Sequence, residues 1–91
     1  MTVEHDPAGH RFGADTPGGQ AELVYSFFTE TVLNIEHTEV PAGARGLHVG
    51  DALIRAALAY AREHGFLVMT TCPFAQRWLA AHPGERPPGP S

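Results

Sequence analysis

Apolar and polar residues alternate along two stretches in the first half of the chain, residues 21–28 and 32–40. Alternation with a period of two is typical of a strand that buries one face. A shorter stretch at 10–14 has a similar pattern. Because only a few turn residues separate the three stretches, the pattern predicts three antiparallel strands. On the second strand, the face predicted to be buried carries Ala21, Leu23, Tyr25 and Phe27.

The second half of the chain begins with a helical period. Between residues 49 and 64, apolar side chains recur every three or four positions, and Gly65 is placed to end the helix. The apolar run at 66–71 predicts a strand covered on both faces, and Pro73 favours a second helix that ends at residue 81. Strand–helix–strand order predicts a right-handed crossover, with the fourth strand parallel to the third. The predicted fold class is therefore α+β.

A length of 91 residues fits one small domain. Residues 10–83 hold the predicted strands and helices. Residues 1–9 are predicted to be a flexible lead-in, and the Pro- and Gly-rich residues 84–91 a flexible tail.

Composition and charge exclude several classes of protein. The net charge is −4, and the 6 Lys and Arg residues form no run, so nucleic-acid binding has no electrostatic support. No apolar run approaches the ~20 residues of a membrane span, and the first residues are too polar for a secretory signal. A single cysteine fits a reducing, cytoplasmic compartment. The six His are scattered, so no metal site is expected.

A Gly-containing turn joins the third strand to the long helix. Backbone N–H groups and the positive end of a helix dipole meet there, which is an arrangement that binds anions such as phosphate. An ordinary strand-to-helix turn explains the same residues without a ligand. The candidate anion-binding residues are Arg45, Gly46, Leu47, His48, Val49, Gly50 and Asp51.

Three motifs occur in order along the chain: His37-Thr38-Glu39-Val40-Pro41, then Arg45-Gly46 with Gly50, then Cys72-Pro73-Phe74. Together they resemble a small, single-domain family of GNAT-type N-acetyltransferases. The resemblance implies that the domain binds acetyl-CoA and transfers acetyl to an unidentified acceptor, expected to be an amine. It implies that the amides of Glu39 and Val40 pair with the pantetheine arm and that residues 45–51 hold the pyrophosphate.

His48 stands where this family usually has Gly. Its side chain must either point away from the phosphates or donate a hydrogen bond to them.

Two residues are candidates for the chemistry itself. Cys72 precedes Pro73, and a helix N-terminus favours the thiolate, so Cys72 is an acyl-accepting nucleophile or a wall of the thioester pocket. Both alternatives stay open from the sequence. His37 is a candidate general base, because imidazole exchanges protons near neutral pH, or else a histidine hydrogen-bonded at the strand edge. Glu36 and Glu39 are alternative bases.

A second function is compatible with the same residues: a module that binds coenzyme A without turning it over, or one that binds another protein. No helical pattern precedes residue 48, whereas typical members of the family build part of the acceptor wall from helices there. The acceptor side is therefore expected to be open, or completed by a second copy in a homodimer.

Overall fold

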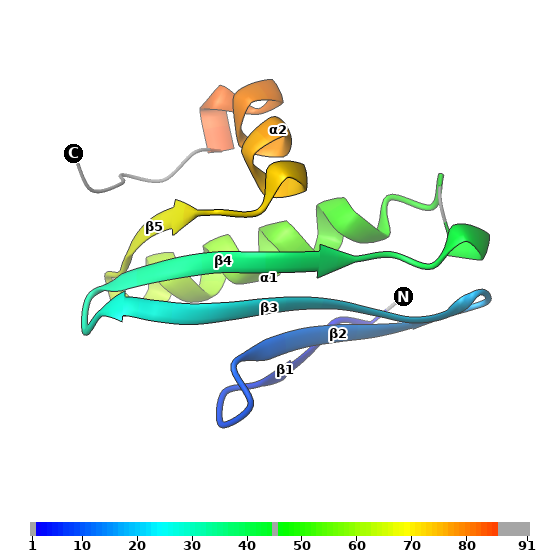
Figure 1. The fold of residues 1–91 in the computed structure, drawn as a ribbon, viewed down its shortest axis with the longest axis horizontal. Helices are drawn as coiled ribbons and strands as arrows, with labels where there is room; N and C mark the ends of the chain where they lie inside the picture. Colours follow the sequence, from blue (N-terminus) through cyan, green and yellow to red (C-terminus); the bar gives the residue numbers. More distant parts are fainter. Residues whose placement is uncertain (1, 45, 86–91) are drawn as a thin grey trace.

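The computed structural model describes residues 2–44 and 46–85. Five strands form one sheet in the order β1 to β5 (Figure 1). The first four pair antiparallel, and β5 runs parallel to β4, which confirms the predicted α+β class and the crossover. The elements are β1 (Glu4–Asp6), β2 (Arg11–Thr16), β3 (Gly19–Thr29), β4 (Val32–Glu39), α1 (Val49–His64), β5 (Leu67–Thr70) and α2 (Pro73–Ala81), with short 3₁₀ turns at Ala42–Ala44 and Pro83–Glu85.

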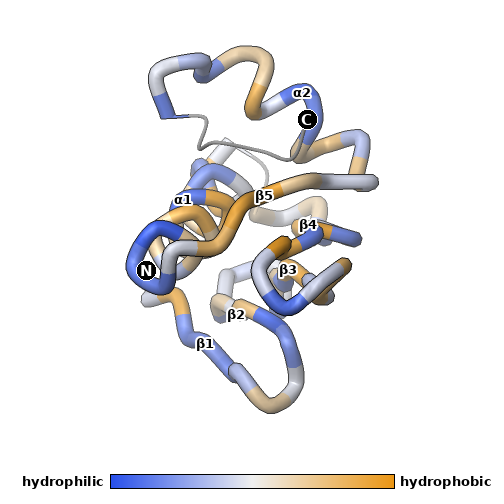
Figure 2. Tube along the Cα trace, turned by 90° about the vertical axis from the view of Figure 1, so that its left-hand side faces the viewer, coloured by the Kyte–Doolittle hydropathy of each residue, from blue (hydrophilic) through white to orange (hydrophobic). Residues whose placement is uncertain are grey.

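The core lies between the sheet and α1. In Figure 2 α1 lies beside the sheet, and α2 lies beyond β5. On β3 the predicted alternation is confirmed, because Ala21, Leu23 and Tyr25 are buried while the residues between them are partly exposed. The face of α1 that meets these strands buries Val49, Leu53, Ile54, Ala57, Leu58 and Ala61.

Two β-bulges interrupt the pairing of β3 with β4. Val24 pairs with His37 and the next residue, Tyr25, with Ile35, so Glu36 is an extra residue on β4. Near the turn, Phe28 is the extra residue on β3, and 71% of it is exposed. A bulge bends its strand and increases the local twist. The bulge at Glu36 lies immediately after the last residue of β4 that pairs with β5.

Three details of the sequence prediction are wrong. Residues 4–6 of the predicted flexible lead-in form β1 and pair with β2. The predicted two-sided burial of the fourth strand is also wrong, because β5 is the edge of the sheet and only Val68 of its four residues is buried. An apolar run alone does not distinguish a strand that is covered on both faces from an edge strand that is covered on one. The start of the predicted flexible tail, residues 84 and 85, instead belongs to the 3₁₀ turn Pro83–Glu85, where Glu85 accepts hydrogen bonds from Arg55. Residues 86–91 of the tail lie outside the described residues.

A cluster of aromatic rings explains why β1 is ordered. The ring of His5 stacks on Phe12 at 4.0 Å and meets the edge of Tyr60 at 4.4 Å. Its Nε2 atom lies 2.7 Å from the Tyr25 hydroxyl. Burial, with a smaller contribution from Tyr60, raises the pKa of Tyr25 to about 12, so the phenol is protonated at neutral pH and can donate to His5. One histidine therefore attaches β1 to the core.

We predict that this attachment weakens in mild acid. Burial lowers the pKa of His5; the carboxylate of Asp6 partly opposes the effect, and His64 adds to it. The unfolded chain therefore takes up the proton first as the pH falls, and stability is lost as the pH drops through the ordinary histidine value. His5→Phe keeps a ring on Phe12 but cannot be protonated. Urea midpoints at about pH 7.5 and about pH 5.5 should differ less in His5→Phe than in the wild type; equal differences would contradict the assignment.

Candidate functional site

The parallel pairing of β4 with β5 stops halfway along β4. The amide of Leu67 donates to Thr31 O at 2.8 Å, and the amide of Thr71 donates to Ile35 O at 3.1 Å. Alternate residues of a strand donate to a parallel neighbour, so the next donor after Thr71 would be residue 73. Residue 73 is proline and has no N–H. The paired register accordingly ends at Ile35 and Thr70, while β4 continues to Glu39. The two strands separate there, and the second half of β4 keeps one side free of β5.

The chain leaves β4 through a compact turn and enters α1. Gly46 has a φ of 87° and His48, the N-cap of α1, has a φ of 58°, so both lie in the left-handed region. Position 48, where the motif predicted Gly, therefore has a conformation that Gly adopts without steric cost. Arg45, which the sequence places among the phosphate ligands, lies outside the described residues.

An open hollow of about 370 Å³ lies at this turn. Residues from the end of β4, from the turn, from the first turn of α1 and from α2 surround it. They include most of the candidate anion-binding residues; Phe74 comes from the third motif, and Ala44 is the one lining residue that the sequence did not single out. The lining residues are Val40, Ala44, Gly46, His48, Val49, Gly50, Asp51 and Phe74.

A carboxylate is already present at the start of α1. Asp51 Oδ1 accepts a hydrogen bond from Trp78 Nε1 at 2.7 Å, and Asp51 Oδ2 lies 3.2 Å from His48 Nδ1. Burial alone would raise the pKa of Asp51, but the hydrogen bonds from Trp78 and His48 outweigh it and hold that pKa below its usual value. A ligand anion here would meet the turn's N–H groups and the exposed imidazole of His48, and it would lie near a fixed negative charge.

Helix α2 packs against the start of α1 through a glycine. A Cβ atom added to Gly50 would lie 2.5 Å from Cζ of Phe74, closer than real Cβ contacts come. A side chain at position 50 would displace the Phe74 ring, so Gly50 allows the two helices to pack as they do, whether or not phosphate also approaches it. Arg55 strengthens the same contact, because it donates to Glu85 at 2.8 and 3.0 Å and lies 5.4 Å from the Trp78 ring centre.

Cys72 lies where β4 and β5 separate. It is the N-cap of α2 and only 4% of it is exposed. Its thiol points to the Thr38 hydroxyl at 3.8 Å, and its amide donates to the Thr70 hydroxyl at 3.0 Å. The sequence prediction that Cys72 occupies a helix N-terminus is confirmed, whereas its chemical role stays a prediction.

Residues 11–86 match the family of GCN5-related N-acetyl-transferases. The chain belongs to this family.

Curated relatives share most of its length. Protein NATD1 of Mus musculus is 30% identical over 85 residues, which cover 91% of this chain and 77% of that protein. Protein NATD1 of Danio rerio is 28% identical over the same share of both chains.

Solved structures share the fold. The NMR structure of a GCN5-like protein from Staphylococcus aureus superposes with a TM-score of 0.69 at 27% identity, covering 92% of this chain and 82% of that one. A structure from Pyrococcus furiosus, at 24% identity and a TM-score of 0.54, covers 78% of this chain and 56% of that one and shows the fold alone.

Within this acetyltransferase fold, His37 and Cys72 have different neighbours. His37 pairs with Val24 on β3, is exposed, and lies 3.5 Å from the carboxylate of Glu39. Successive side chains of a strand point to opposite faces, and the next residue, Thr38, is the one that meets Cys72. The two sequence candidates for catalysis therefore lie on opposite faces of β4, and Thr38 is a neighbour of Cys72 that sequence reasoning missed.

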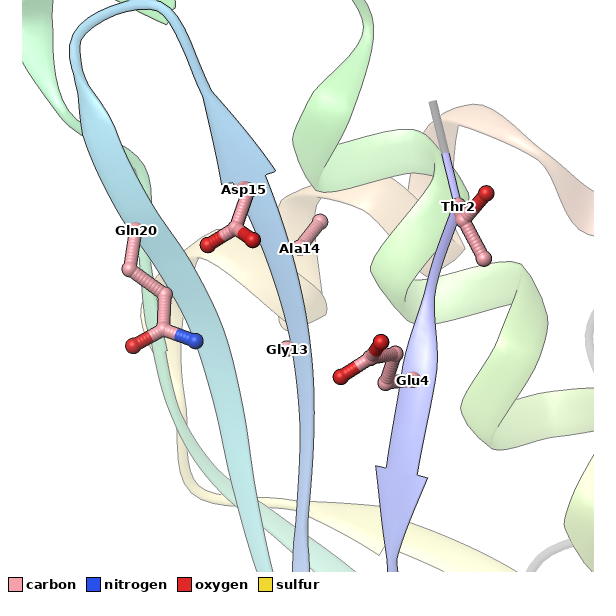
Figure 3. A pocket seen from close by; sticks show the side chains of 6 residues that line it. All are labelled: Thr2, Glu4, Gly13, Ala14, Asp15 and Gln20. Atoms are coloured by element: carbon pink, nitrogen blue, oxygen red, sulfur yellow. The ribbon is translucent and has the colours of Figure 1, made fainter.

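A second hollow, of about 240 Å³, lies over β1, β2 and β3. Figure 3 shows Glu4 and Asp15 on neighbouring strands near Gly13, with Gln20 on the far side of Asp15. Its lining is polar, and it shares no residue with the hollow at the start of α1. Among residues 2–44 and 46–85, no group of three or more His, Cys, Asp or Glu is arranged to hold a metal ion. None of the helices in this described part is long and apolar enough to cross a membrane.

We predict that His48→Gly stabilises the domain. A non-Gly residue in the left-handed region costs roughly 1 kcal/mol, and the exposed contact with Asp51 returns only part of it. His48→Ala removes the same contact but keeps the strained backbone, so it is the matched control. Urea unfolding should rank His48→Gly above His48→Ala by about 1 kcal/mol. Equal stability of the two variants would mean that the turn carries no such strain.

Proposed function

We propose that this domain is an enzyme that binds acetyl-CoA in the gap between β4 and β5 and transfers the acetyl group to an amine. The observation that carries the proposal is the early end of the β4–β5 pairing at Ile35 and Thr70. It leaves backbone groups of β4 free beside a hollow that opens at a helix N-terminus. The family supports the reaction class, since its members are named as N-acetyl-transferases.

The pantetheine arm, an extended chain with two amides, would lie along the free side of β4. We assign the backbone groups of Glu39 and Val40 as its partners, because they follow the last paired residue and Val40 lines the hollow. An extended chain placed there continues the hydrogen-bonding that β5 leaves unfinished. The thioester would then lie near Thr38 and Cys72.

The pyrophosphate would lie against residues 46–50, with Arg45 as a further cation from outside the described residues. N–H groups at a helix start bind phosphate through their dipoles. Asp51 opposes an anion at this place, and the exposed imidazole of His48, whose Nδ1 lies 3.2 Å from Asp51 Oδ2, is the side chain beside it that can donate a hydrogen bond to phosphate.

In the transfer, the amine nitrogen attacks the thioester carbonyl, the C–N bond forms, the C–S bond breaks, and the amine proton leaves. We propose His37 as the group that receives that proton through water around the free edge of β4, because it is exposed there and lies on the opposite face of the strand from Thr38 and Cys72. Cys72 is buried and faces Thr38, on the opposite face from His37. We therefore propose direct transfer to the amine, with Cys72 as a wall of the pocket. The acceptor site is proposed to be open, or completed by a second copy of the chain.

We predict that Leu47→Glu weakens acetyl-CoA binding. Leu47 is exposed in the turn, so a carboxylate there adds a like charge near the phosphates without disturbing the core. Two charges a few ångströms apart in water repel by about 1 kcal/mol, so Kd should rise about fivefold at low salt. Calorimetry measures the effect. Gly50 is not a suitable position, because any side chain there meets Phe74.

The matched control for this charge is Leu47→Gln, which has the same size and should bind close to the wild type. Leu47→Lys should bind more tightly, and both shifts should shrink as salt is added. If Leu47→Glu and Leu47→Lys bind acetyl-CoA equally, the phosphates do not lie at this turn. If the wild type binds but releases no coenzyme A with a library of amines, the domain is a binding module and the proposed activity is wrong.

We predict that Cys72 carries no acetyl group during turnover. Cys72 is the single cysteine of the chain, so intact-mass spectrometry with acetyl-CoA and no amine reports on it directly. The expected result is no thiol adduct, and Cys72→Ala should keep a substantial part of the wild-type rate, since alanine also fits a buried position. An acetyl adduct, together with an inactive Cys72→Ala, would instead identify a covalent intermediate on the thiol.

A further inference from the structure

The hydroxyl of Thr70 makes two hydrogen bonds at the point where β5 leaves β4. It donates to the carbonyl of Ile35 at 2.7 Å and accepts from the amide of Cys72 at 3.0 Å. The Ile35 carbonyl also receives the last bond of the parallel series, from the Thr71 amide. The hydroxyl therefore connects Ile35, the last residue of β4 that pairs with β5, to Cys72, which follows β5.

The backbone of Thr70 connects this point to α2. Its carbonyl accepts a hydrogen bond from the side chain of Gln76 at 3.2 Å. The carbonyl of Cys72 receives the first bond of the helix, from the Gln76 amide at 2.9 Å. Through Thr70, the end of β4, the buried cysteine and the first turn of α2 are held in one network.

The Cys72 amide needs this hydroxyl. Cys72 is buried, and within residues 2–44 and 46–85 no strand lies on the outer side of β5 to accept the bond. A buried N–H group without a partner is costly, so it would favour conformations that expose the residue to water. Serine at position 70 can make the same two bonds, whereas valine has the same shape as threonine and can make neither.

We propose that Thr70 is a positioning residue: its hydroxyl holds Cys72 in place beside Thr38 and so sets the width of the gap between β4 and β5. Its importance for catalysis rests on the proposed function, which places the thioester in that gap. The positioning of Cys72 by Thr70 does not depend on the proposed function and can be measured on the protein without acetyl-CoA.

The first test uses the chemical reactivity of Cys72. N-ethylmaleimide reacts with the free protein, and because the chain has a single cysteine, the intact mass gives the rate at Cys72. A thiol that is 4% exposed reacts when the local structure opens. The variants are Thr70→Val, which removes the hydroxyl, and Thr70→Ser, which keeps it. Thr71→Val is the matched control, the same change at the exposed neighbouring residue.

Thr70→Val should react about fivefold faster than the wild type or more, which is the change in open population that one ordinary hydrogen bond supports. Thr70→Ser and Thr71→Val should react at the wild-type rate within about twofold. A wild-type rate in Thr70→Val overturns the proposal. So does acceleration in Thr71→Val, which indicates general loosening, or in Thr70→Ser, which shows that the hydroxyl is not what holds the cysteine.

A measurement on the wild type covers the case in which Thr70→Val does not fold. Hydrogen exchange followed by NMR should show the Cys72 amide protected, although no strand pairs with it, because the Thr70 hydroxyl accepts its bond. An unprotected Cys72 amide overturns the proposal without any variant.

The second test separates positioning from cofactor binding. If the wild type turns over acetyl-CoA, Thr70→Val should lower kcat at least about threefold and leave Kd for acetyl-CoA within about twofold, because the phosphate turn is unchanged. Thr70→Ser should restore kcat. An unchanged kcat in Thr70→Val overturns the catalytic part of the proposal. If the wild type does not bind acetyl-CoA, the proposed function fails, and the alkylation rates and the amide exchange alone decide whether Thr70 holds Cys72.

Discussion

The parallel hydrogen bonding between β4 and β5 determines where the gap between these strands, the free half of β4 and the start of α2 lie. Two of its bonds, from Leu67 and Thr71, fix the start and the end of the pairing, and the next donor is missing because residue 73 is proline. The same proline starts α2, since a helix tolerates proline in its first turn. Pro73 thus ends the pairing of β5 with β4 and leaves the second half of β4 without a partner on that side. It is also the first residue of α2, which packs against the core.

The phosphate turn and the gap between the strands are not independent, because α2 contacts both. Phe74 lies over Gly50 at the start of α1, and Trp78 donates to Asp51 one residue further on. At its own start, α2 is fixed through Cys72 to the hydroxyls of Thr38 and Thr70. Helix α2 therefore forms part of both places: Phe74 and Trp78 border the phosphate turn, and its N-cap, Cys72, borders the gap between the strands.

Much of the fold could be predicted from residue periodicity, and the misses have physical causes. The bounds of α1 and the parallel fourth strand follow from spacing and chain order. Strand β1 has no apolar alternation to detect, because a histidine among polar residues makes the core contact. The placement of His37 and Cys72 on opposite faces depends on the bulge at Glu36 and on pairing between distant residues. The motifs identified the candidate site residues, but only the tertiary structure shows which of them are neighbours.

The contact between Gly50 and Phe74 has a consequence for how this sequence can change over time. A side chain at position 50 would meet the tip of the Phe74 ring, so the ring would have to move aside or be replaced by something smaller. Substitutions at the two positions should therefore be coupled, and aligned relatives that lack the glycine should more often lack the aromatic ring as well.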